Sequence, residues 1–509
     1  MYNSNYLAKH IRAASIGNEN KVFAWLDNDA SISYGELFSS AEKIALVLQN
    51  NGVSPGDRVA AQVGKSISAI ELYLGTVMAG GVFLPLNTAY TAAEVSYFLG
   101  DASPAIFVCD SERISSLEDV AAKANVGKLM SLSSDGSSGS LIDEKAEASG
   151  DFTEVERDVD DLAAILYTSG TTGRSKGAML SHRALASNAA TLKEYWQFSS
   201  DDCLIHALPI FHIHGLFVAI NITLFAGSSL HFLTSFDADE ITSRMHRSTV
   251  LMGVPTFYVR LLQSPELNKE LASNMRLFIS GSAPLLSETH VAWQQKTGHA
   301  ILERYGMTET NMNTSNPYDG ERRPGTVGLP LPDVELKITA PDSGKTLNEG
   351  EVGQIEVRGP NVFSGYWKMP EKTAEELRVD GWFLTGDIGV IDSDGYVSIV
   401  GRSKDLIISG GFNVYPKEIE EIIDDNPTVV ESAVIGVPHP DFGEAVVAVV
   451  VKQPSCEGTE ASIKAPMLEQ LAKYKQPKRV FFVDELPRNA MGKVQKAKLR
   501  EDYKSCFLS

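Results

Sequence analysis

The chain is poor in the features that mark secreted, membrane-spanning and nucleic-acid-binding proteins. Its 509 residues include only four cysteines, which lie far apart and form no Cys-x-x-Cys or Cys/His spacing. We therefore expect free thiols in a reducing compartment. No apolar run approaches about 18 residues, which argues against membrane insertion. No block rich in lysine and arginine occurs, and the formal net charge is −20, which argues against a nucleic-acid surface.

The N-terminus carries no signal-peptide pattern, so we expect a cytoplasmic protein. Residues 6–14 can form a short amphipathic helix. We interpret it as a surface helix, and a weak organelle signal is the alternative.

Two widespread nucleotide-binding motifs are also missing. A Walker P-loop places serine or threonine directly after its lysine, whereas Lys176 is followed by Gly177. No Gly-x-Gly-x-x-Gly follows an expected strand. A kinase-like P-loop fold and a Rossmann dehydrogenase are therefore disfavoured.

The length and the order of strand and helix signals indicate an α/β protein. A chain of 509 residues is too long for one core. Ser33 and Glu36 form a capping-box pattern that opens a helix through residue 48. The alternation that follows predicts a mostly parallel sheet with flanking helices. The last hundred residues predict a small α+β domain, with helices at 416–423 and 465–474 and strands at 432–437, 445–451 and 478–483.

One polar stretch dominates the chain. Residues 167–177 read Tyr-Thr-Ser-Gly-Thr-Thr-Gly-Arg-Ser-Lys-Gly, between the apolar runs 162–166 and 178–180. This pattern predicts a strand, a tight polar loop and a second strand. Glycines let backbone N–H groups approach an anion, and Arg174 and Lys176 add positive charge. Such a loop suits a polyphosphate.

Three further segments carry groups that a nucleotide needs. Residues 275–284 predict a strand that leads into a turn of small residues, against which a flat base can lie. Glu309 lies in the polar segment 303–310, and a carboxylate beside phosphates makes sense if it helps to hold Mg²⁺. Asp387 ends a glycine-containing turn and could accept from both ribose hydroxyls.

These motifs, together with Arg402 and a loop containing Lys493, resemble the AMP-forming acyl-CoA synthetases in order and approximate spacing over nearly the whole chain. One departure is Ser175, where that family usually has proline. The resemblance implies a large N-terminal adenylation domain at 1–403, a hinge at Lys404, and a small mobile C-terminal domain at 404–509. It also implies ATP and CoA as co-substrates and Mg²⁺ as cofactor.

The resemblance assigns roles to individual residues. Lys493, Glu309 and His212 are expected to be catalytic, and Thr168 and Glu309 to hold the metal. The CoA-binding residues are expected to be Ser409, Gly410, Gly411 and Phe412. The expected ATP-binding residues are Thr168, Ser169, Gly170, Thr171, Thr172, Gly173, Lys176, Gly281, Ala283, Pro284, Glu303, Arg304, Tyr305, Gly306, Thr308, Asp387 and Arg402.

A cation in an apolar segment indicates which kind of acid is the substrate. Arg260 interrupts residues 251–262, and we expect it to be a buried guanidinium that pairs with a second carboxylate. Snorkelling of its head group to the surface is the alternative. With His212, Ser282 and Met312 it would form the acid pocket. His212 and His214 could also suggest a metal pair, but the sequence offers no further ligands.

The segments that carry these residues are similar to those of malonyl-CoA synthetases, with Ile213 where threonine is frequent. We therefore expect a malonate–CoA ligase that forms malonyl-CoA, AMP and diphosphate through a malonyl-adenylate. The alternatives are a CoA ligase for methylmalonate or another short-chain, medium-chain or aryl acid, and a non-catalytic nucleotide-binding scaffold. The expected partners are small molecules, and the sequence indicates no oligomeric state.

Overall fold

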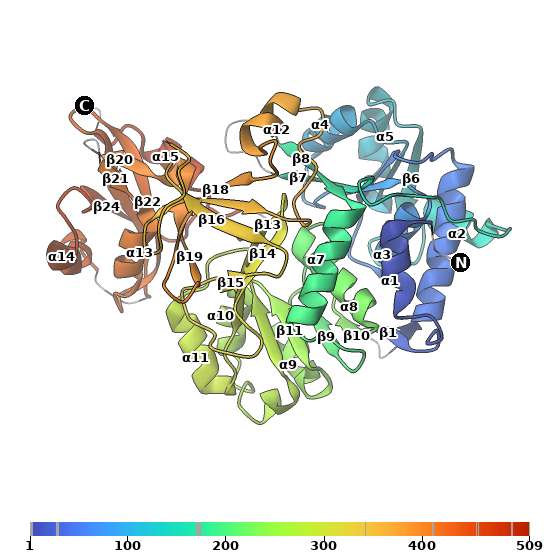
Figure 1. The fold of residues 1–509 in the computed structure, drawn as a ribbon, viewed down its shortest axis with the longest axis horizontal. Coiled ribbons are helices and arrows are strands. Elements are labelled where there is room, and N and C mark those ends of the chain that lie inside the picture. The colour runs from blue at the N-terminus through green and yellow to red at the C-terminus, as the bar shows by residue number, and fades with distance from the viewer. Residues whose placement is uncertain are drawn as a thin grey trace. The chain divides into compact units, whose positions relative to one another are not determined.

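The computed structural model describes residues 4–26, 30–168, 175–341, 343–409, 412–454, 456, 458–489 and 492–507. The chain forms two compact units (Figure 1). The first contains Met1–Leu336 and Val357–Phe383, and the second contains Lys337–Glu356 and Leu384–Ser509. The predicted domain boundary between 403 and 404 marks the start of a moving segment and stays a prediction.

A six-stranded sheet in the first unit carries the polar loop at its edge. Its order is β6-β5-β3-β4-β7-β8. Every pairing is parallel except the antiparallel pair of β7 and β8. The strands are β3 (Arg58–Gln62), β4 (Val82–Pro85), β5 (Ile106–Asp110), β6 (Lys128–Leu132), β7 (Leu162–Thr168) and β8 (Lys176–Ser181).

A nine-stranded sheet forms the rest of the first unit's framework, in the order β15-β14-β13-β12-β11-β9-β10-β1-β2. Its central pairings are parallel, and antiparallel pairs close both edges. The strands are β1 (Val22–Trp25), β2 (Ser31–Ser33), β9 (Cys203–His206), β10 (Ser229–Phe232), β11 (Val250–Gly253), β12 (Leu277–Ser280), β13 (Leu302–Met307), β14 (Asn311–Ser315) and β15 (Leu329–Pro330).

Helices pack on these two sheets through their apolar faces. The predicted capping box is present at the start of α2, where Ser33 and Glu36 bond each other's backbone N–H groups. The helices of this unit are α1 (Tyr6–Ala13), α2 (Tyr34–Asn50), α3 (Ile67–Met78), α4 (Ala92–Ala102), α5 (Ile114–Lys123), α6 (Ser140–Glu147), α7 (His182–Tyr195), α8 (Asn221–Ala226), α9 (Ala238–Arg244), α10 (Pro255–Leu262), α11 (Ser287–Thr297) and α12 (Pro370–Glu376).

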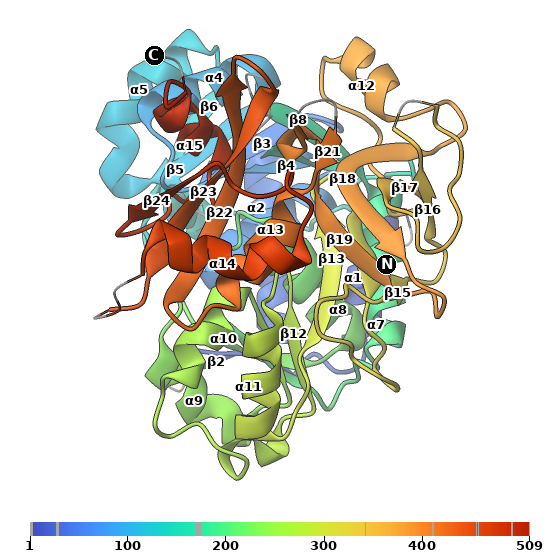
Figure 2. The same cartoon turned by 90° about the vertical axis from the view of Figure 1, so that its left-hand side faces the viewer.

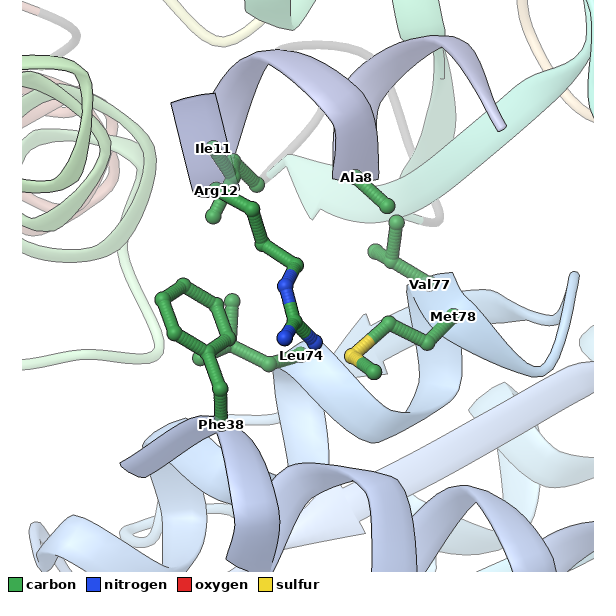
Figure 3. Close-up of a pocket in the computed structure, with 7 residues that line it drawn as sticks. All are labelled: Ala8, Ile11, Arg12, Phe38, Leu74, Val77 and Met78. Carbon is green, nitrogen blue, oxygen red and sulfur yellow. The ribbon is translucent and has the colours of Figure 1, made fainter. Parts of the chain in front are cut away.

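The expected N-terminal helix, α1, is an integral part of this unit. It buries Leu7, Ala8 and Ile11. Figure 3 shows Arg12 extending from α1 toward Phe38 of α2 and Leu74 and Met78 of α3. Its guanidinium lies 4.6 Å from the Phe38 ring and pairs with Glu42 at 2.8 Å. The helix is therefore anchored by both apolar and charged contacts.

The second unit contains two smaller sheets. The four-stranded sheet, most of which belongs to this unit, has the order β16-β17-β18-β19, and the other has β21-β20-β23-β22 with β24 paired to β23. The strands are β16 (Glu335–Thr339), β17 (Gly353–Arg358), β18 (Phe383–Ile391), β19 (Val397–Arg402), β20 (Ile407–Ser409), β21 (Phe412–Val414), β22 (Val429–His439), β23 (Gly443–Lys452) and β24 (Arg479–Val483).

Helices cover both faces of the β22–β23 sheet. The helices α13 (Pro416–Asp424) and α14 (Glu460–Gln470) pack on one face, and α15 (Lys496–Tyr503) packs on the other (Figure 2). The α14 helix begins five residues before the predicted start at 465, because Thr459 caps it and bonds reciprocally with Ser462. The predicted α/β class, with a large N-terminal part and a smaller α+β part, is confirmed. Among the described residues, no helix is both long and apolar enough to cross a membrane.

Candidate active site

The polar loop connects two strands, as predicted. Thr168 ends β7 and Lys176 begins β8, and the two residues pair directly across the antiparallel ladder. The Tyr97 hydroxyl donates a 2.8 Å hydrogen bond to the backbone carbonyl of Ser175, which fixes the end of the loop. The strands therefore place Thr168 and Lys176 side by side at the base of the predicted phosphate loop.

Lys176 belongs to a charged cluster in the first unit. Its Nζ lies 3.3 and 3.4 Å from the two carboxylate oxygens of Glu376 and 4.1 Å from the Tyr366 ring centroid. The Tyr366 hydroxyl lies 2.6 Å from Glu376 Oε2 and 3.0 Å from Glu309 Oε1. Burial raises the pKa of Tyr366, and Glu309 and Glu376 raise it further, so the phenol remains a donor. The cluster thus links the loop lysine to the predicted metal carboxylate.

Backbone hydrogen bonds fix Glu309 at the turn between β13 and β14. Its backbone carbonyl accepts a 2.7 Å bond from the Phe363 N–H group. The Asn361 side-chain amide donates to the Thr310 and Met312 carbonyls at 2.7 and 3.2 Å. Glu309 is itself buried. A buried carboxylate that is linked to the phosphate-loop lysine through Tyr366 fits Mg²⁺, which takes one or two carboxylates together with phosphate oxygens.

A buried cation lies behind the turn that follows β12. The Arg304 side chain is buried, and its Nε and Nη2 atoms have no hydrogen-bond partner among the described residues. Burial lowers the pKa of this guanidinium to about 9. A Cβ atom at Gly281 would lie 2.4 Å from Arg304 Cζ. Glycine is therefore needed there, because the planar guanidinium lies directly against the backbone.

Ser282 and His214 adjoin this cation. Ser282 Oγ lies 3.3 Å from His214 Nδ1. The backbone of Ser282 has a φ of 71°, a left-handed conformation that costs a non-glycine residue about 1–3 kcal/mol and is concentrated at functional sites. Burial lowers the pKa of His214 well below its usual value, and Arg304 lowers it further. His214 is therefore a neutral imidazole at neutral pH.

The predicted site residue His212 lies next to this pair but is only half-buried. Its Nδ1 accepts a 3.2 Å bond from the His214 N–H group. His214 also begins a π-helical segment, His214–Ile220, of a kind that is frequent at functional sites. His214 contacts Ser282 through its side chain.

The expectation that Arg260 is buried is wrong. The α10 helix turns Phe257, Tyr258 and Leu261 toward the core, so Arg260 in its last turn lies on the outer face and is exposed. Its guanidinium lies 5.5 Å from the Phe236 ring centroid, and it forms no ion pair within the described residues. The role of Arg260 in binding the acid stays a prediction.

The remaining predicted residues of the first unit surround these groups. A Cβ atom at Gly306 would lie 1.9 Å from the Asn311 carbonyl oxygen, and Met312 is buried against the same glycine. Glu303 is buried and accepts a 3.3 Å bond from the Leu285 N–H group. Tyr305 is also buried, Thr308 and Ala283 are half-buried, and Pro284 is exposed.

The second unit brings Asp387 and Arg402 together. The two residues lie directly opposite each other on β18 and β19. Arg402 Nε is 2.6 Å from Asp387 Oδ1, and the carboxylate is nearly fully buried. This pairing fits the prediction that both residues act on one group, such as a ribose.

The other predicted residues of the second unit lie in a 3₁₀ turn, in the strands β20 and β21, and in the segment that precedes α15. Lys404 lies in a short 3₁₀ turn, and burial lowers its pKa. Ser409 pairs with Phe412 in the β20–β21 hairpin, where the Phe412 ring is exposed and stacks on Tyr474 at 4.7 Å. Lys493 is exposed in a turn that is fixed by a 3.0 Å bond from its backbone N–H group to Asn489 Oδ1.

Several predicted residues lie outside the part of the chain that the structure describes. They are the ATP-binding residues Ser169, Gly170, Thr171, Thr172 and Gly173 and the CoA-binding residues Gly410 and Gly411.

Sequence reasoning missed Tyr366, Glu376 and the pairing of His214 with Ser282. Tyr366 follows Gly365 in an unremarkable loop, and Glu376 is one of several acidic residues in 371–376. The antiparallel bridge between Ala178 and Tyr366 brings Tyr366 next to β8, and the Glu376 side chain reaches Lys176 from α12. Such long-range pairing has no local signal.

Comparisons with known proteins agree with this geometry. A family model described as "AMP-binding enzyme" matches residues 11–367, and one described as "AMP-binding enzyme C-terminal domain" matches residues 418–493. A protein named malonate–CoA ligase from Arabidopsis thaliana is 36% identical over 527 residues, covering 93% of this chain and 85% of that protein.

Two other similarities show the range of the family. A long-chain-fatty-acid–CoA ligase from Bacillus subtilis is 32% identical over 508 residues, covering 92% of this chain and 90% of that protein. The crystal structure of ATP-bound MatB from Rhodopseudomonas palustris is 59% identical, with a TM-score of 0.96, and covers 99% of this chain and 100% of its own. The chain belongs to the AMP-binding enzyme family and is an AMP-forming acyl-CoA ligase.

Proposed function

We propose that the protein is a malonate–CoA ligase, which converts malonate, ATP and CoA into malonyl-CoA, AMP and diphosphate through a malonyl-adenylate. The observation that carries this proposal is the buried Arg304 guanidinium, two of whose nitrogen atoms have no partner among the described residues. Leaving a charged group buried and unpaired is costly. An anionic group of the ligand would remove that cost.

The position of Arg304 favours the substrate as the source of that anion. The guanidinium lies against Gly281, whose neighbour Ser282 contacts the neutral His214. A cation, a hydroxyl and an imidazole together suit a carboxylate. An acid with an apolar tail offers nothing for these groups, whereas the second carboxylate of malonate would pair with Arg304 and accept from Ser282.

Arg260 has a different place in this proposal from the one the sequence suggested. Because its guanidinium is exposed, it would contribute less per contact than a buried cation, since water screens its charge. We propose that Arg304, which the family resemblance assigned to ATP, is instead the main partner of the distal carboxylate and that Arg260 assists from the solvent side. Met312, which is buried, would limit the space around the central carbon of the acid.

The two half-reactions use different groups. The acid carboxylate attacks the α-phosphate of ATP, and negative charge grows on the departing diphosphate. Lys176 and the loop hydroxyls would hold the phosphates, and Lys493 would neutralise charge at the reacting oxygens. Glu309, together with Thr168, would hold Mg²⁺, which when bound neutralises phosphate charge. Asp387 and Arg402 would hold the ribose.

Thiol attack then has to reach the carbonyl carbon. We propose that residues 404–509 move as a C-terminal domain about Lys404 and withdraw Lys493 after adenylation. The hairpin that contains Ser409 and Phe412 would then line the path of the CoA thiol. The family relationship and the exposed turn that carries Lys493 support this scheme.

The similar proteins support the choice of acid. Malonate is the substrate in the name of the Arabidopsis thaliana relative, while a long-chain fatty acid is the substrate in the name of the Bacillus subtilis relative. Membership of the family therefore does not identify the acid substrate. The polar groups around Arg304 are the feature that favours malonate over a long-chain fatty acid.

The proposal is tested by ATP–pyrophosphate exchange with a panel of acids: malonate, methylmalonate, acetate, butyrate, octanoate and benzoate. We expect malonate to give the highest kcat/KM. A higher kcat/KM with octanoate or benzoate, or no exchange with malonate, would contradict it.

A further inference from the structure

The cluster around Lys176 contains two residues to which the proposed reaction gives no role, Tyr366 and Glu376. They come from the segment that follows β17 and from the end of α12, which Figure 1 shows beside β7 and β8. Three backbone bonds hold this segment against β8: Met179 N–H donates to the Gly365 carbonyl, Ser364 N–H to the Met179 carbonyl, and Trp367 N–H to the Gly177 carbonyl. The position of Tyr366 next to Lys176 is therefore fixed by the fold.

Glu376 already pairs with Lys176, the cation that the phosphates of the nucleotide need. Both of its oxygens contact Lys176 Nζ, at 3.3 and 3.4 Å. Lys372 provides a second cation, 2.9 Å from Glu376 Oε1. The triphosphate of ATP carries more negative charge than one carboxylate, so it would displace Glu376 from Lys176. Glu376 would keep Lys372 as its partner, so this exchange leaves no unpaired charge.

Tyr366 contacts both carboxylates with one hydroxyl. A phenol has a single proton to donate, so it can serve Glu376, at 2.6 Å, or Glu309, at 3.0 Å, but not both at once. While Glu376 is paired with Lys176, a hydrogen bond from Tyr366 stabilises its carboxylate less. When phosphates take Lys176, the proton would move fully to Glu376, and the Glu309 oxygen would be released for a cation.

We propose that Tyr366 is a positioning residue that couples phosphate binding at Lys176 to cation binding at Glu309, with Glu376 as the displaceable counter-ion. The ring of Tyr366 supports the ammonium group of Lys176, and its hydroxyl orients Glu309 only in one of the two states. This inference rests on the proposed use of Lys176 and Glu309 for MgATP. It does not depend on which acid is activated.

The test is calorimetric titration of the protein with ATP in the absence of any acid, with and without Mg²⁺, and of the ATP-free protein with Mg²⁺ alone. The variants are Tyr366→Phe, Glu376→Gln and the control Glu375→Gln. Glu375 lies on the same helix and pairs with Lys372 at 2.7 Å. Within the described residues it contacts neither Lys176 nor Tyr366. Tyr366→Phe keeps the aromatic ring and removes only the shared hydroxyl.

We expect Tyr366→Phe to weaken ATP binding about tenfold both with and without Mg²⁺, because the displaced Glu376 loses its donor. We expect the same variant to tighten the binding of Mg²⁺ to the ATP-free protein about threefold, because the hydroxyl no longer occupies the Glu309 oxygen. We expect Glu376→Gln to strengthen ATP binding about threefold, because the amide does not compete for Lys176 as an anion. The control should bind as the wild type does. In pyrophosphate exchange, Tyr366→Phe should raise KM for MgATP and leave kcat within about threefold.

Two results would overturn the inference. One is wild-type MgATP affinity in Tyr366→Phe, which would make the hydroxyl irrelevant. The other is Mg²⁺ binding to the ATP-free protein that Tyr366→Phe leaves unchanged, which would show that the hydroxyl does not compete with a cation at Glu309. A wild type that binds MgATP but does not activate malonate would contradict the proposed function alone.

Discussion

Replacing Arg304 by methionine tests whether this buried cation binds a ligand or stabilises the fold. Methionine has a similar length, is apolar and tolerates irregular packing. Arg304 is 2% exposed, and its guanidinium forms no ion pair among the described residues. The substitution therefore removes a buried charge without leaving a protein partner unpaired, and the folded protein should be at least as stable as the wild type.

The effect on malonate should be large. Truncating one partner of a desolvated charge pair costs about 2–5 kcal/mol, which corresponds to a loss of about 30-fold to several thousand-fold in kcat/KM for malonate. For butyrate, which has no second carboxylate, the loss should be less than about threefold. The pocket of Arg304→Met should therefore change its preference rather than lose all activity.

The assay is ATP–pyrophosphate exchange with both acids, combined with thermal unfolding of each protein. Arg304→Lys is the matched variant, because it keeps the charge and loses the planar fork that lies against Gly281. Its malonate activity should lie between those of the wild type and Arg304→Met. Unchanged malonate kcat/KM in Arg304→Met would refute the reasoning, as would a loss of several kcal/mol in stability.

Three further predictions address other parts of the protein. Lys493→Ala should abolish adenylation and retain thioester formation from supplied malonyl-adenylate, measured as CoA consumption; equal loss of both steps would contradict the two-step scheme. Gly281→Ala should lower malonate kcat/KM at least about tenfold, because its Cβ would lie 2.4 Å from Arg304 Cζ, and wild-type kinetics would be inconsistent with that contact. Burial lowers the pKa of His182 to about 4. The contribution of this histidine to the free energy of unfolding is therefore complete above about pH 6.5. It is lost as the pH falls toward about 4, by about 1.4 kcal/mol per pH unit. Denaturant unfolding at pH 7 and pH 5 should therefore show a smaller pH effect in His182→Asn, which can still accept the Leu7 N–H bond, and equal effects would contradict the assignment.

Local patterns predicted the framework of the protein well. The capping box of Ser33 and Glu36, the two strands around the polar loop and the proline-initiated α10 helix all depend on neighbouring residues, and all are present. The mostly parallel sheets follow from the alternation of strands and helices. These features are predictable because the interactions that stabilise them lie within a few residues of each other in sequence.

The burial of charged groups was less predictable. Arg260 has apolar neighbours in sequence but lies on the outer face of its helix, whereas Arg304, in a charged and polar segment, is buried beneath Gly281. Helical periodicity explains the first result, since Phe257, Tyr258 and Leu261 take the inner face. The second depends on the parallel pairing of β12 with β13, which a single sequence does not reveal.

The most direct test of the central claim compares malonate with its monoamide, malonamate, as substrates of the wild-type protein. The two acids have nearly the same size and shape and differ in the charge of the distal group. If a buried guanidinium recognises that charge, kcat/KM for malonate should exceed that for malonamate by about 30-fold or more. Equal values for the two acids would contradict the claim that this ligase selects a second carboxylate.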